Sequence, residues 1–358
     1  MSVLVATRGK MIESDMAWSS ESRPGKIRFD NGVRNDIAAT ILSSVGEAFP
    51  IAKSKTRISL KSLRPATDPA GHYLLYVGRN KWFLRVSRRH RKSPELEDIA
   101  SFYIANSGLR VNLPISSRID IPWGSRRYTA YVFPFLDARH FDGSDKDLIC
   151  LGKAVRRMHE AFRHFKFANL VRVNALNTAR RLAKTKEEVE RSIRKGKFSY
   201  FRERSGWAKA NSAWLKEMVK RFNPYLCLMS EAQCVHGELH LGNVLFSNKG
   251  GAAILTDFEE VSDSYFPPSF DIAYLTHRFC MDAISSKNEL KRRFGVLEEA
   301  YGRKSSGLFD MMRQVSWYNI ALIIDRLISG ESITPVEEYE KFVRLKLATE
   351  RFDLERCE

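Results

Sequence analysis

The sequence predicts an α+β protein with two lobes, in which an antiparallel β-sheet with one inserted helix is followed by a mostly helical part. Short strand-like runs dominate residues 57–135, and helical periodicity prevails after residue 136. The chain has 358 residues, which is enough for two hydrophobic cores. We therefore expect a polar N-terminal extension at 1–30, an N-lobe at 31–135 and a C-lobe at 136–358.

The N-lobe is expected to begin with an amphipathic helix, because its apolar residues recur every four positions: Val33, Ile37, Ile41, Val45 and Phe49. Apolar and alternating runs then predict five strands, at 57–63, 72–78, 81–87, 114–121 and 126–135. The run at 95–108 returns to helical spacing and ends on Gly108, a residue typical of a helix C-cap. This order places one helix after the third strand.

The C-lobe is expected to begin with an amphipathic helix at 148–162, followed by two helices that break near Gly196 and Gly206. Three short strands come next, at 233–237, 243–247 and 252–258, with a turn at 248–251. Helical periodicity then continues from about Asp271 to the end.

The charge of the chain is strongly positive and unevenly distributed. Lys and Arg number 59 and Asp and Glu 42, which gives a formal net charge of +17. Residues 165–222 hold 16 Lys or Arg against 5 Asp or Glu, and a second basic run lies at 87–92. Such a field attracts nucleotides, phosphorylated sugars, anionic lipids or nucleic acid, whereas the simpler interpretation is a basic, soluble surface.

Other compositional features point to a reducing cytoplasm. The five cysteines include no C-x-x-C pair, which argues against both a disulfide framework and a zinc site. No apolar stretch approaches the roughly 20 residues of a membrane span. The first residues have only a short apolar run before charges appear, unlike a signal peptide.

The stretch CVHGELHLGNVLF, residues 234–246, together with the strand that follows it, predicts a phosphoryl-transfer site. Glu238 and Asn243 lie on a loop between strands, and Asp257 follows the apolar strand AAILT. A carboxylate and an amide oxygen are hard ligands suited to Mg²⁺, and a second carboxylate can accept a proton from an alcohol. Transfer of a phosphoryl group from ATP requires this combination.

The spacing resembles that of a known family. Protein kinases carry H-R-D-x-x-x-x-N followed by D-F-G. Here His236, Glu238 and Asn243 keep that spacing, and Asp257-Phe258-Glu259 follows. The chain is similar to the aminoglycoside phosphotransferase and choline kinase superfamily, whose members show HGDLHPGN, an I-D-F-E strand end and a downstream Asp, here in SFDIAYL. The resemblance covers about residues 56–276 and implies a bilobal protein-kinase-like fold.

For the nucleotide, the resemblance implies ATP and Mg²⁺ as cofactors. Asn243 and Asp257 would hold Mg²⁺ against the ATP phosphates. Arg85, on the third strand, would contact the phosphates and be oriented by Glu97, with Glu95 and Asp98 as competing partners. The hinge at 133–136, which includes Phe133 and Phe135, would offer backbone groups to adenine.

For the acceptor, the resemblance implies that Glu238 orients or deprotonates the hydroxyl, although the family carries Asp at this position. His236 would brace the loop, His240 would face the γ-phosphate or the acceptor, and Asp271 would fix the loop backbone. Since phosphoryl transfer makes little demand on a strong base, we favour an active enzyme over a pseudokinase that binds a nucleotide or a partner without turnover.

The expected acceptor is a small molecule or a saccharide. If the basic segment 165–222 walls the acceptor site, a neutral or anionic compound is favoured over a polycationic aminoglycoside. A peripheral contact with an anionic membrane or a lipid-linked saccharide is a further expectation. A nucleic-acid or membrane-surface binder remains an alternative, but the sequence contains no recognisable nucleic-acid module and no specific nucleic-acid partner is expected.

Overall fold

The computed structural model describes seven stretches of the chain: 35–48, 58–63, 69–77, 79–87, 94–281, 287–302 and 307–330. The expected N-terminal extension and residues 88–92 of the basic run lie outside these stretches. By their contacts the residues form two compact units. The strand unit comprises Met1–Pro94, Arg110–His140 and Gly242–Asp257, and the helical unit comprises Glu95–Leu109, Phe141–Leu241 and Phe258–Glu358.

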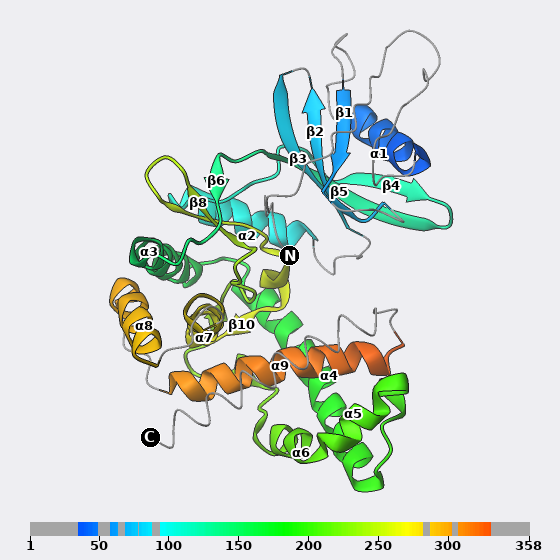
Figure 1. The fold of residues 1–358 in the computed structure, drawn as a ribbon, viewed down its shortest axis with the longest axis vertical. Coiled ribbons are helices and arrows are strands. Elements are labelled where there is room, and N and C mark those ends of the chain that lie inside the picture. The colour runs from blue at the N-terminus through cyan, green and yellow to red at the C-terminus, as the bar shows by residue number, and fades with distance from the viewer. Residues whose placement is uncertain are drawn as a thin grey trace. The chain divides into compact units, whose positions relative to one another are not determined.

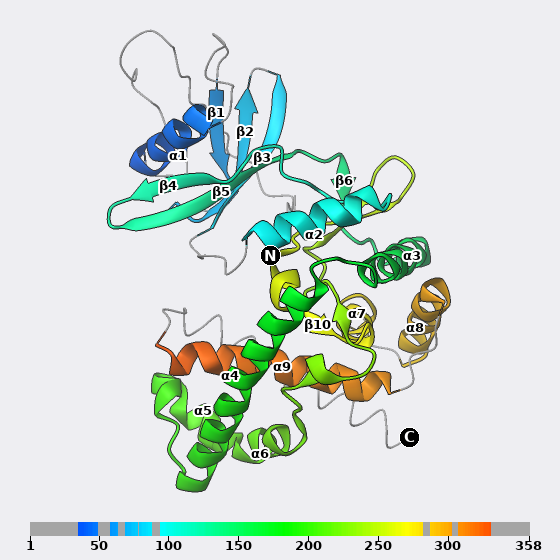
Figure 2. The same cartoon turned by 180° about the vertical axis from the view of Figure 1, so that it is seen from behind.

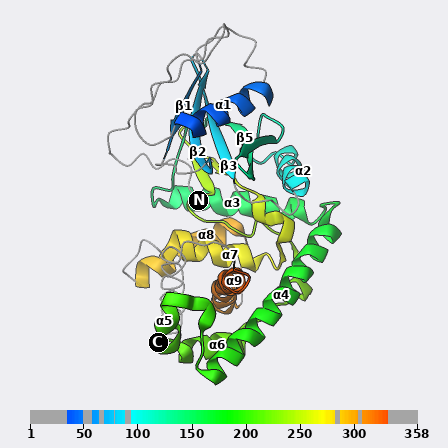
Figure 3. The same cartoon turned by 90° about the vertical axis from the view of Figure 1, so that its right-hand side faces the viewer.

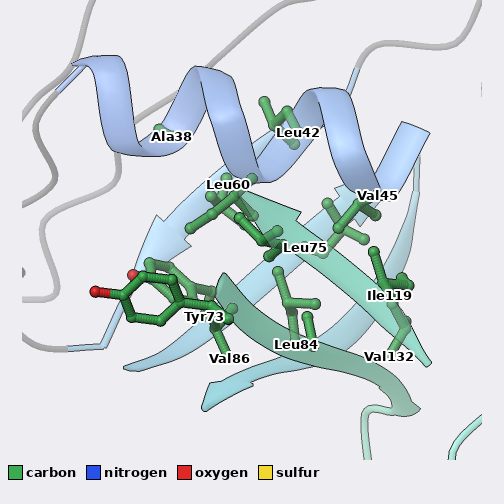
Figure 4. Packing of buried hydrophobic residues seen from close by; sticks show 14 of the residues in the cluster. Ala38, Leu42, Val45, Leu60, Tyr73, Leu75, Leu84, Val86, Ile119 and Val132 are labelled. Carbon is green, nitrogen blue, oxygen red and sulfur yellow. The ribbon is translucent and has the colours of Figure 1, made fainter. Parts of the chain in front are cut away.

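The strand unit contains a five-stranded antiparallel sheet in the order β1-β2-β3-β5-β4. These strands are β1 (Ile58–Ser62), β2 (Gly71–Val77), β3 (Asn80–Ser87), β4 (Ile119–Trp123) and β5 (Arg126–Pro134). Helix α1 (Asn35–Ala48) lies across one face of the sheet (Figure 1). Figure 4 shows Leu42 and Val45 of the helix above Leu60, Leu75 and Leu84 of the sheet. Burial of this apolar face holds the helix to the sheet.

A smaller sheet completes the strand unit, in the order β6-β8-β9. Its strands are β6 (Ala138–Arg139), β8 (Val244–Ser247) and β9 (Ala253–Leu255). β8 and β9 form the predicted hairpin, with Gly250 and Gly251 at positive φ in its turn. All seven residues of the two hairpin strands are buried.

The helical unit is built from long helices and short connecting elements, bounded as follows: α2 (Pro94–Asn106), α3 (Asp145–Phe162), α4 (Ala168–Lys195), η2 (Ser199–Arg204), α5 (Ser205–Ala210), α6 (Ser212–Arg221), η3 (Leu226–Leu228), β7 (Gln233–Cys234), η4 (Glu259–Asp263), β10 (Tyr265–Phe266), α7 (Ser269–Leu275), the π-helix Thr276–Met281, α8 (Lys287–Tyr301) and α9 (Leu308–Ile328). In Figure 2, α4 runs diagonally across α9, and the two helices are in contact. Figure 3 views α9 along its axis, with α7 and α4 beside it.

In the part of the chain that the structure describes, no helix has the length and apolar character needed to cross a bilayer.

The predicted α+β class is confirmed, with three differences in detail. Gly196 ends α4 in the left-handed conformation as predicted, but Gly206 lies inside α5 rather than at a break. The predicted strands at 233–237 and 252–258 are shorter than expected. Gly237 and Asp257 adopt positive φ values of 83° and 62°, which take the chain out of the extended conformation.

Candidate active site

The strand unit brings together two of the predicted residues, Arg85 and Asp257. Arg85 Nη1 donates a hydrogen bond to Asp257 Oδ1 at 2.6 Å, and each side chain is 16% exposed. Arg85 is fixed in register because β3 is paired on both sides, with β2 and β5. A partly buried charge pair of this kind is stronger than a surface pair, because less water screens it.

The backbone of Asp257 is strained. Among the described residues, Asp257 is the one non-glycine position with a positive φ, at 62°. Asp and Asn tolerate the left-handed region better than most residues, yet the conformation still costs free energy. Strain of this kind persists where the surroundings enforce it, and it concentrates at functional sites. The position directly after β9 therefore has a functional signature that the sequence did not show.

Asn243 lies at the same end of the hairpin as Asp257. Its backbone oxygen accepts a hydrogen bond from Thr256 N at 3.0 Å, one residue before the aspartate, and its side chain is 1% exposed. Mg²⁺ usually takes one or two protein oxygen ligands and completes its shell with phosphates and water. The amide oxygen and the carboxylate fit this requirement. Elsewhere in the described stretches, no group of three or more His, Cys, Asp or Glu is placed to hold a metal.

The predicted hinge residues Phe133 and Phe135 lie at the end of β5 and just beyond it. Phe133 pairs with Phe83 of β3, and their ring centroids are 6.1 Å apart. The ammonium group of Lys81 lies 3.7 Å from the centroid of the Phe135 ring, a cation–π contact that the sequence analysis did not foresee. Contact between this hinge and adenine stays a prediction.

In the helical unit, a buried carboxylate fixes the backbone of the catalytic loop, as expected. Asp271, on α7, accepts hydrogen bonds from the amides of His236 and Gly237, each at 2.9 Å. His159 Nε2 lies 2.9 Å from Asp271 Oδ2, and His159 Nδ1 lies 2.9 Å from the hydroxyl of Tyr301. Asp271 has no exposed surface. A buried charge is tolerable here because several donors satisfy it.

Position 237 accommodates glycine because there is no room for a Cβ atom. Its φ is 83°, and a Cβ atom would overlap Ser264 Oγ and lie 2.8 Å from Ser264 Cβ. The ring of His236 packs against Phe258, with centroids 4.8 Å apart. His236 therefore braces the loop against the residue that follows Asp257, close to the role that the family resemblance implied.

Glu238 and His240 extend from this fixed loop. Glu238 Oε1 lies 3.7 Å from His240 Nε2, and the side chains are 38% and 18% exposed. Nearby Tyr274 is buried, and burial together with the charge of Glu238 raises the pKa of its hydroxyl, an effect that Arg278 opposes. The Glu238 carboxylate thus lies in the electrostatic environment of a tyrosine and an arginine that sequence reasoning missed.

Two further residues near the loop were also missed. The Cβ of Glu260 lies 3.5 Å from where a Cβ on Gly237 would be, so its carboxyl-bearing side chain starts beside the loop. The Arg278 guanidinium lies 5.8 Å from the Tyr274 ring centroid and is carried by the π-helix. π-Helical turns occur frequently at functional sites. The acidic run after Phe258 was visible in the sequence, whereas nothing in it predicted the π-helix.

The basic segment 165–222 is the part of the chain expected to wall the acceptor site. Its longest helix, α4, does pack against η4 of the loop region, where Asn174 Nδ2 donates to Ser262 O at 3.0 Å. The residues of α4 that are buried are uncharged: Val171, Ala175, Thr178, Ala179, Leu182, Thr185, Val189 and Ser192. Its Lys and Arg side chains are exposed or half-buried. That positive charge walls the acceptor site stays a prediction.

The predicted partner of Arg85 lies on α2. Glu97 is 8% exposed, whereas the competing Glu95 is exposed and Asp98 is half-buried. Burial distinguishes Glu97 from the alternatives, because a charged side chain is seldom buried without a partner. The ion pair between Glu97 and Arg85 stays a prediction.

Comparison with known proteins places these features in a wider group. A family described as "Phosphotransferase enzyme family" (APH) matches residues 63–302. A spectinomycin phosphotransferase, solved with ADP and spectinomycin, has 14% sequence identity and a TM-score of 0.60, with 89% of this chain and 99% of that chain covered.

Two further solved structures are similar. A microcompartment-associated aminopropanol kinase has 12% identity and a TM-score of 0.53, and it covers 88% of this chain and 98% of its own. An ethanolamine kinase from Plasmodium vivax has 14% identity and a TM-score of 0.51, with 81% and 82% covered. Among curated proteins no match was found.

Proposed function

Since the chain belongs to the phosphotransferase enzyme family, we propose that it transfers the γ-phosphoryl group of ATP to a hydroxyl of a small molecule. The observation that carries this proposal is Asp257, a carboxylate held at a strained φ of 62° and ion-paired with Arg85 at 2.6 Å. Other described aspartates, such as Asp325 and Asp310, also pair with arginine, but they do not share the positive φ of Asp257. A residue that must present oxygen atoms to a metal and its phosphates gains from both.

In this proposal the strand unit supplies the residues for the nucleotide. Mg²⁺, when bound, would supply positive charge against the phosphates, and Asn243 and Asp257 are the residues that would hold it. Arg85 holds Asp257 in place and adds a second positive charge on the phosphate side. Because phosphoryl transfer depends mainly on positioning and charge neutralisation, these three residues carry most of the expected rate enhancement.

The catalytic loop supplies the residue for the acceptor. Glu238 is half-exposed, so its carboxylate can accept a hydrogen bond and a proton from a hydroxyl. Its extra methylene, relative to the family's Asp, moves the carboxylate by about 1 Å, and misplacement on that scale costs up to roughly 10²-fold. The alternative is a pseudokinase, in which the same loop binds a ligand without turnover.

The charge of the acceptor is best predicted from the helical unit. The sequence alone favoured a neutral or anionic acceptor, because the basic segment 165–222 was expected to wall the acceptor site. Carboxylates lie near the loop instead: Glu238, Glu260 and Asp263, of which the first two act on Tyr274 and the last two on Tyr318. The opposing positive charges, which lower the pKa of these tyrosines, are Arg278 at Tyr274 and Arg181 of α4 at Tyr318. We therefore propose an acceptor that carries an amine as well as a hydroxyl group.

Two similar proteins support this choice. The aminopropanol kinase and the ethanolamine kinase are both named for acceptors that bear an amine and a hydroxyl group. A cleft with excess negative charge raises the local concentration of such cations and lowers that of phosphorylated sugars. A neutral or anionic saccharide, as the sequence suggested, is the competing acceptor class.

A panel assay of ADP formation with Mg-ATP tests the proposal. It should compare amino alcohols, amino sugars, neutral sugars and sugar phosphates, with Asp257→Asn as the inactive control. Glu260→Gln should raise KM for the amine-bearing acceptors several-fold and leave KM for ATP unchanged. Glu187→Gln, on the exposed face of α4, is the matched control for loss of one carboxylate.

The outcomes separate the alternatives. Turnover of saccharides without turnover of any amine would restore the acceptor class predicted from sequence. Thermal stabilisation by Mg-ATP with no turnover of any acceptor would indicate a pseudokinase. Full activity of Asp257→Asn would show that the site assignment is wrong.

A further inference from the structure

A stretch of 26 residues around the first half of α4 contains no acidic residue. Between Ala161 and Lys186 there are seven basic residues and no Asp or Glu: Arg163, Lys166, Arg172, Arg180, Arg181, Lys184 and Lys186. Two of them are used within the fold. Arg181 Nε donates to Asp325 Oδ2 at 2.6 Å, and Lys186 Nζ donates to the carbonyl of Phe222 at 2.8 Å.

The other five basic side chains of this stretch are exposed. Within the described part of the chain none of the five forms an ion pair with a carboxylate. Other exposed arginines have an acidic partner one helical turn away, as Arg191 has in Glu188 and Arg156 has in Glu160. An unbroken row of uncompensated cations is costly through self-repulsion, so a function that uses the charge explains it better than solubility does.

Large apolar side chains are exposed on the same helix. Phe167, Leu170 and Val173 are spaced three residues apart, so they lie on adjacent turns, and they are 42%, 48% and 54% exposed. The remainder of α4 buries its apolar residues in the ordinary amphipathic way. These three are therefore an extension of apolar surface onto the solvent side of the helix.

The neighbouring turn η3 enlarges this surface. Cys227 of η3 packs with Ala175 and Ala179 of α4 in a small buried cluster. The next two residues, Leu228 and Met229, are 53% and 44% exposed. Burial raises the pKa of the Cys227 thiol, and the positive charge of Arg172 acts in the opposite direction. We call the five apolar and five basic exposed residues together the α4–η3 surface.

We propose that the α4–η3 surface docks on the face of an anionic lipid bilayer. The basic side chains would contact lipid phosphates, and Phe167, Leu170, Val173, Leu228 and Met229 would enter the interface between headgroups and acyl chains. From Arg172 to Lys184 the helix α4 extends about 18 Å, at 1.5 Å per residue, so one helix can place several cations along the membrane plane. Anionic lipid attracts each such cation, and inserted apolar side chains add affinity that charge alone does not supply.

The apolar component favours lipid over nucleic acid. A nucleic-acid backbone is recognised by cations and polar donors, and exposed leucine, valine and methionine side chains gain little from it. A lipid interface stabilises both the basic and the apolar side chains of the α4–η3 surface. The same helix bonds to η4 through Asn174, so docking would occur on the unit that carries the catalytic loop.

Vesicle flotation of the full chain tests this proposal. Vesicles of phosphatidylglycerol and phosphatidylcholine should bind the protein at least tenfold more tightly than vesicles of phosphatidylcholine alone. Arg172→Glu/Arg180→Glu should weaken binding roughly tenfold or more, because each cation near an anionic surface contributes to affinity. Leu170→Ser/Val173→Ser should weaken it severalfold without changing the net charge.

Matched control variants show whether the effect is local. Lys216→Glu/Lys220→Glu makes the same charge change on exposed residues of α6, and Ile149→Ser/Phe309→Ser removes two exposed apolar side chains from α3 and α9. Both controls should bind vesicles like the original protein, and all variants should keep its melting temperature and its stabilisation by Mg-ATP.

Three outcomes would overturn the proposal. They are no preference for anionic vesicles, equal losses in the α6 control, or binding that Leu170→Ser/Val173→Ser leaves unchanged. If double-stranded DNA binds as tightly as anionic vesicles and depends only on the charge variants, the surface is a general polyanion site and not a lipid one. Because the readout is binding, it does not depend on the acceptor or on turnover.

Discussion

The two groups of site residues are held in place by different physical means. In the strand unit, Arg85 and Asp257 are fixed by a partly exposed ion pair and a strained backbone. In the helical unit, the loop is fixed by Asp271, a buried carboxylate with three hydrogen-bond donors. The first arrangement leaves charged groups available to exchange partners with a ligand. The second is part of the core, so changes there should affect stability before they affect chemistry.

The largest effect on activity is expected from Asp257→Asn. Asparagine tolerates the left-handed backbone, so the fold should survive, while loss of the carboxylate should lower kcat/KM on the order of 10³-fold. Steady-state kinetics and thermal unfolding measure the two quantities separately. Asp257→Ala is the control for the backbone, since it should lose stability as well. If Asp257→Asn and Asp257→Ala lose the same amount of stability, the contrast between the site residues of the strand unit and those of the helical unit is wrong.

The largest effect on stability is expected from Asp271→Ala. The change leaves the amides of His236 and Gly237 and the His159 ring without their acceptor in the core. We expect a loss of about 3–5 kcal/mol in the free energy of unfolding, measured by urea denaturation. An unchanged denaturation midpoint would mean that the loop is not part of the cooperative core.

A somewhat smaller loss in the free energy of unfolding is expected from Gly237→Ala. The new Cβ meets Ser264, and the residue keeps a positive φ, which together should cost about 2–4 kcal/mol. Adding Ser264→Gly should recover part of that loss, because it removes the clash but not the unfavourable φ. If the double variant is no more stable than the single one, the clash is not the cause.

Glu238 should behave differently, because its side chain is half-exposed and the loop backbone does not depend on it. Glu238→Gln should lower kcat roughly 10²-fold and leave the melting temperature unchanged. Glu238→Asp should lower kcat less than Glu238→Gln does, since it keeps the carboxylate and only shifts it by about 1 Å. Loss of stability in either variant would assign Glu238 to the structural group instead.

The smallest effect is expected from Glu289, an exposed carboxylate that accepts hydrogen bonds from Arg292 and Arg293 at 2.8 and 2.9 Å. These bonds lower the pKa of Glu289 from 4.5 to about 2. A lowered pKa contributes stability above pH 4.5 that is lost as the pH falls toward 2. Glu289→Gln should therefore slightly flatten the acid side of the stability profile, and a large change would contradict the weakness of exposed ion pairs.

Much of the fold could be predicted because local signals agreed with the tertiary structure. The strand at 81–87 and the helix at 95–108 carry apolar patterns that match their burial, and the predicted hairpin turn at 248–251 is present. The break at Gly206 was wrong because a glycine near a helix start is tolerated when packing supports the helix. Motif spacing predicted the candidate site residues, since it reflects loop lengths that the fold fixes, and the structure brings Arg85 and Asp257 together.

The remaining features depend on tertiary contacts that no local pattern encodes. The hydrogen bond from Arg85 to Asp257 joins residues 172 positions apart. The positive φ of Asp257 likewise has no local pattern that predicts it. The charge count of residues 165–222 was correct, but a count does not tell which face of a helix carries the charge. Alternation of buried and exposed positions along α4 decides that, and there the uncharged positions are the buried ones.

The carboxylate of Asp271 has a consequence for motion. The amides of His236 and Gly237 are tied to a core side chain with no exposed surface, although they belong to a loop. Their protons can be replaced by deuterium only when this anchor opens, so their exchange should be as slow as that of strand amides. In a deuterium-uptake experiment, this stretch of loop should therefore be among the slowest parts of the protein to exchange.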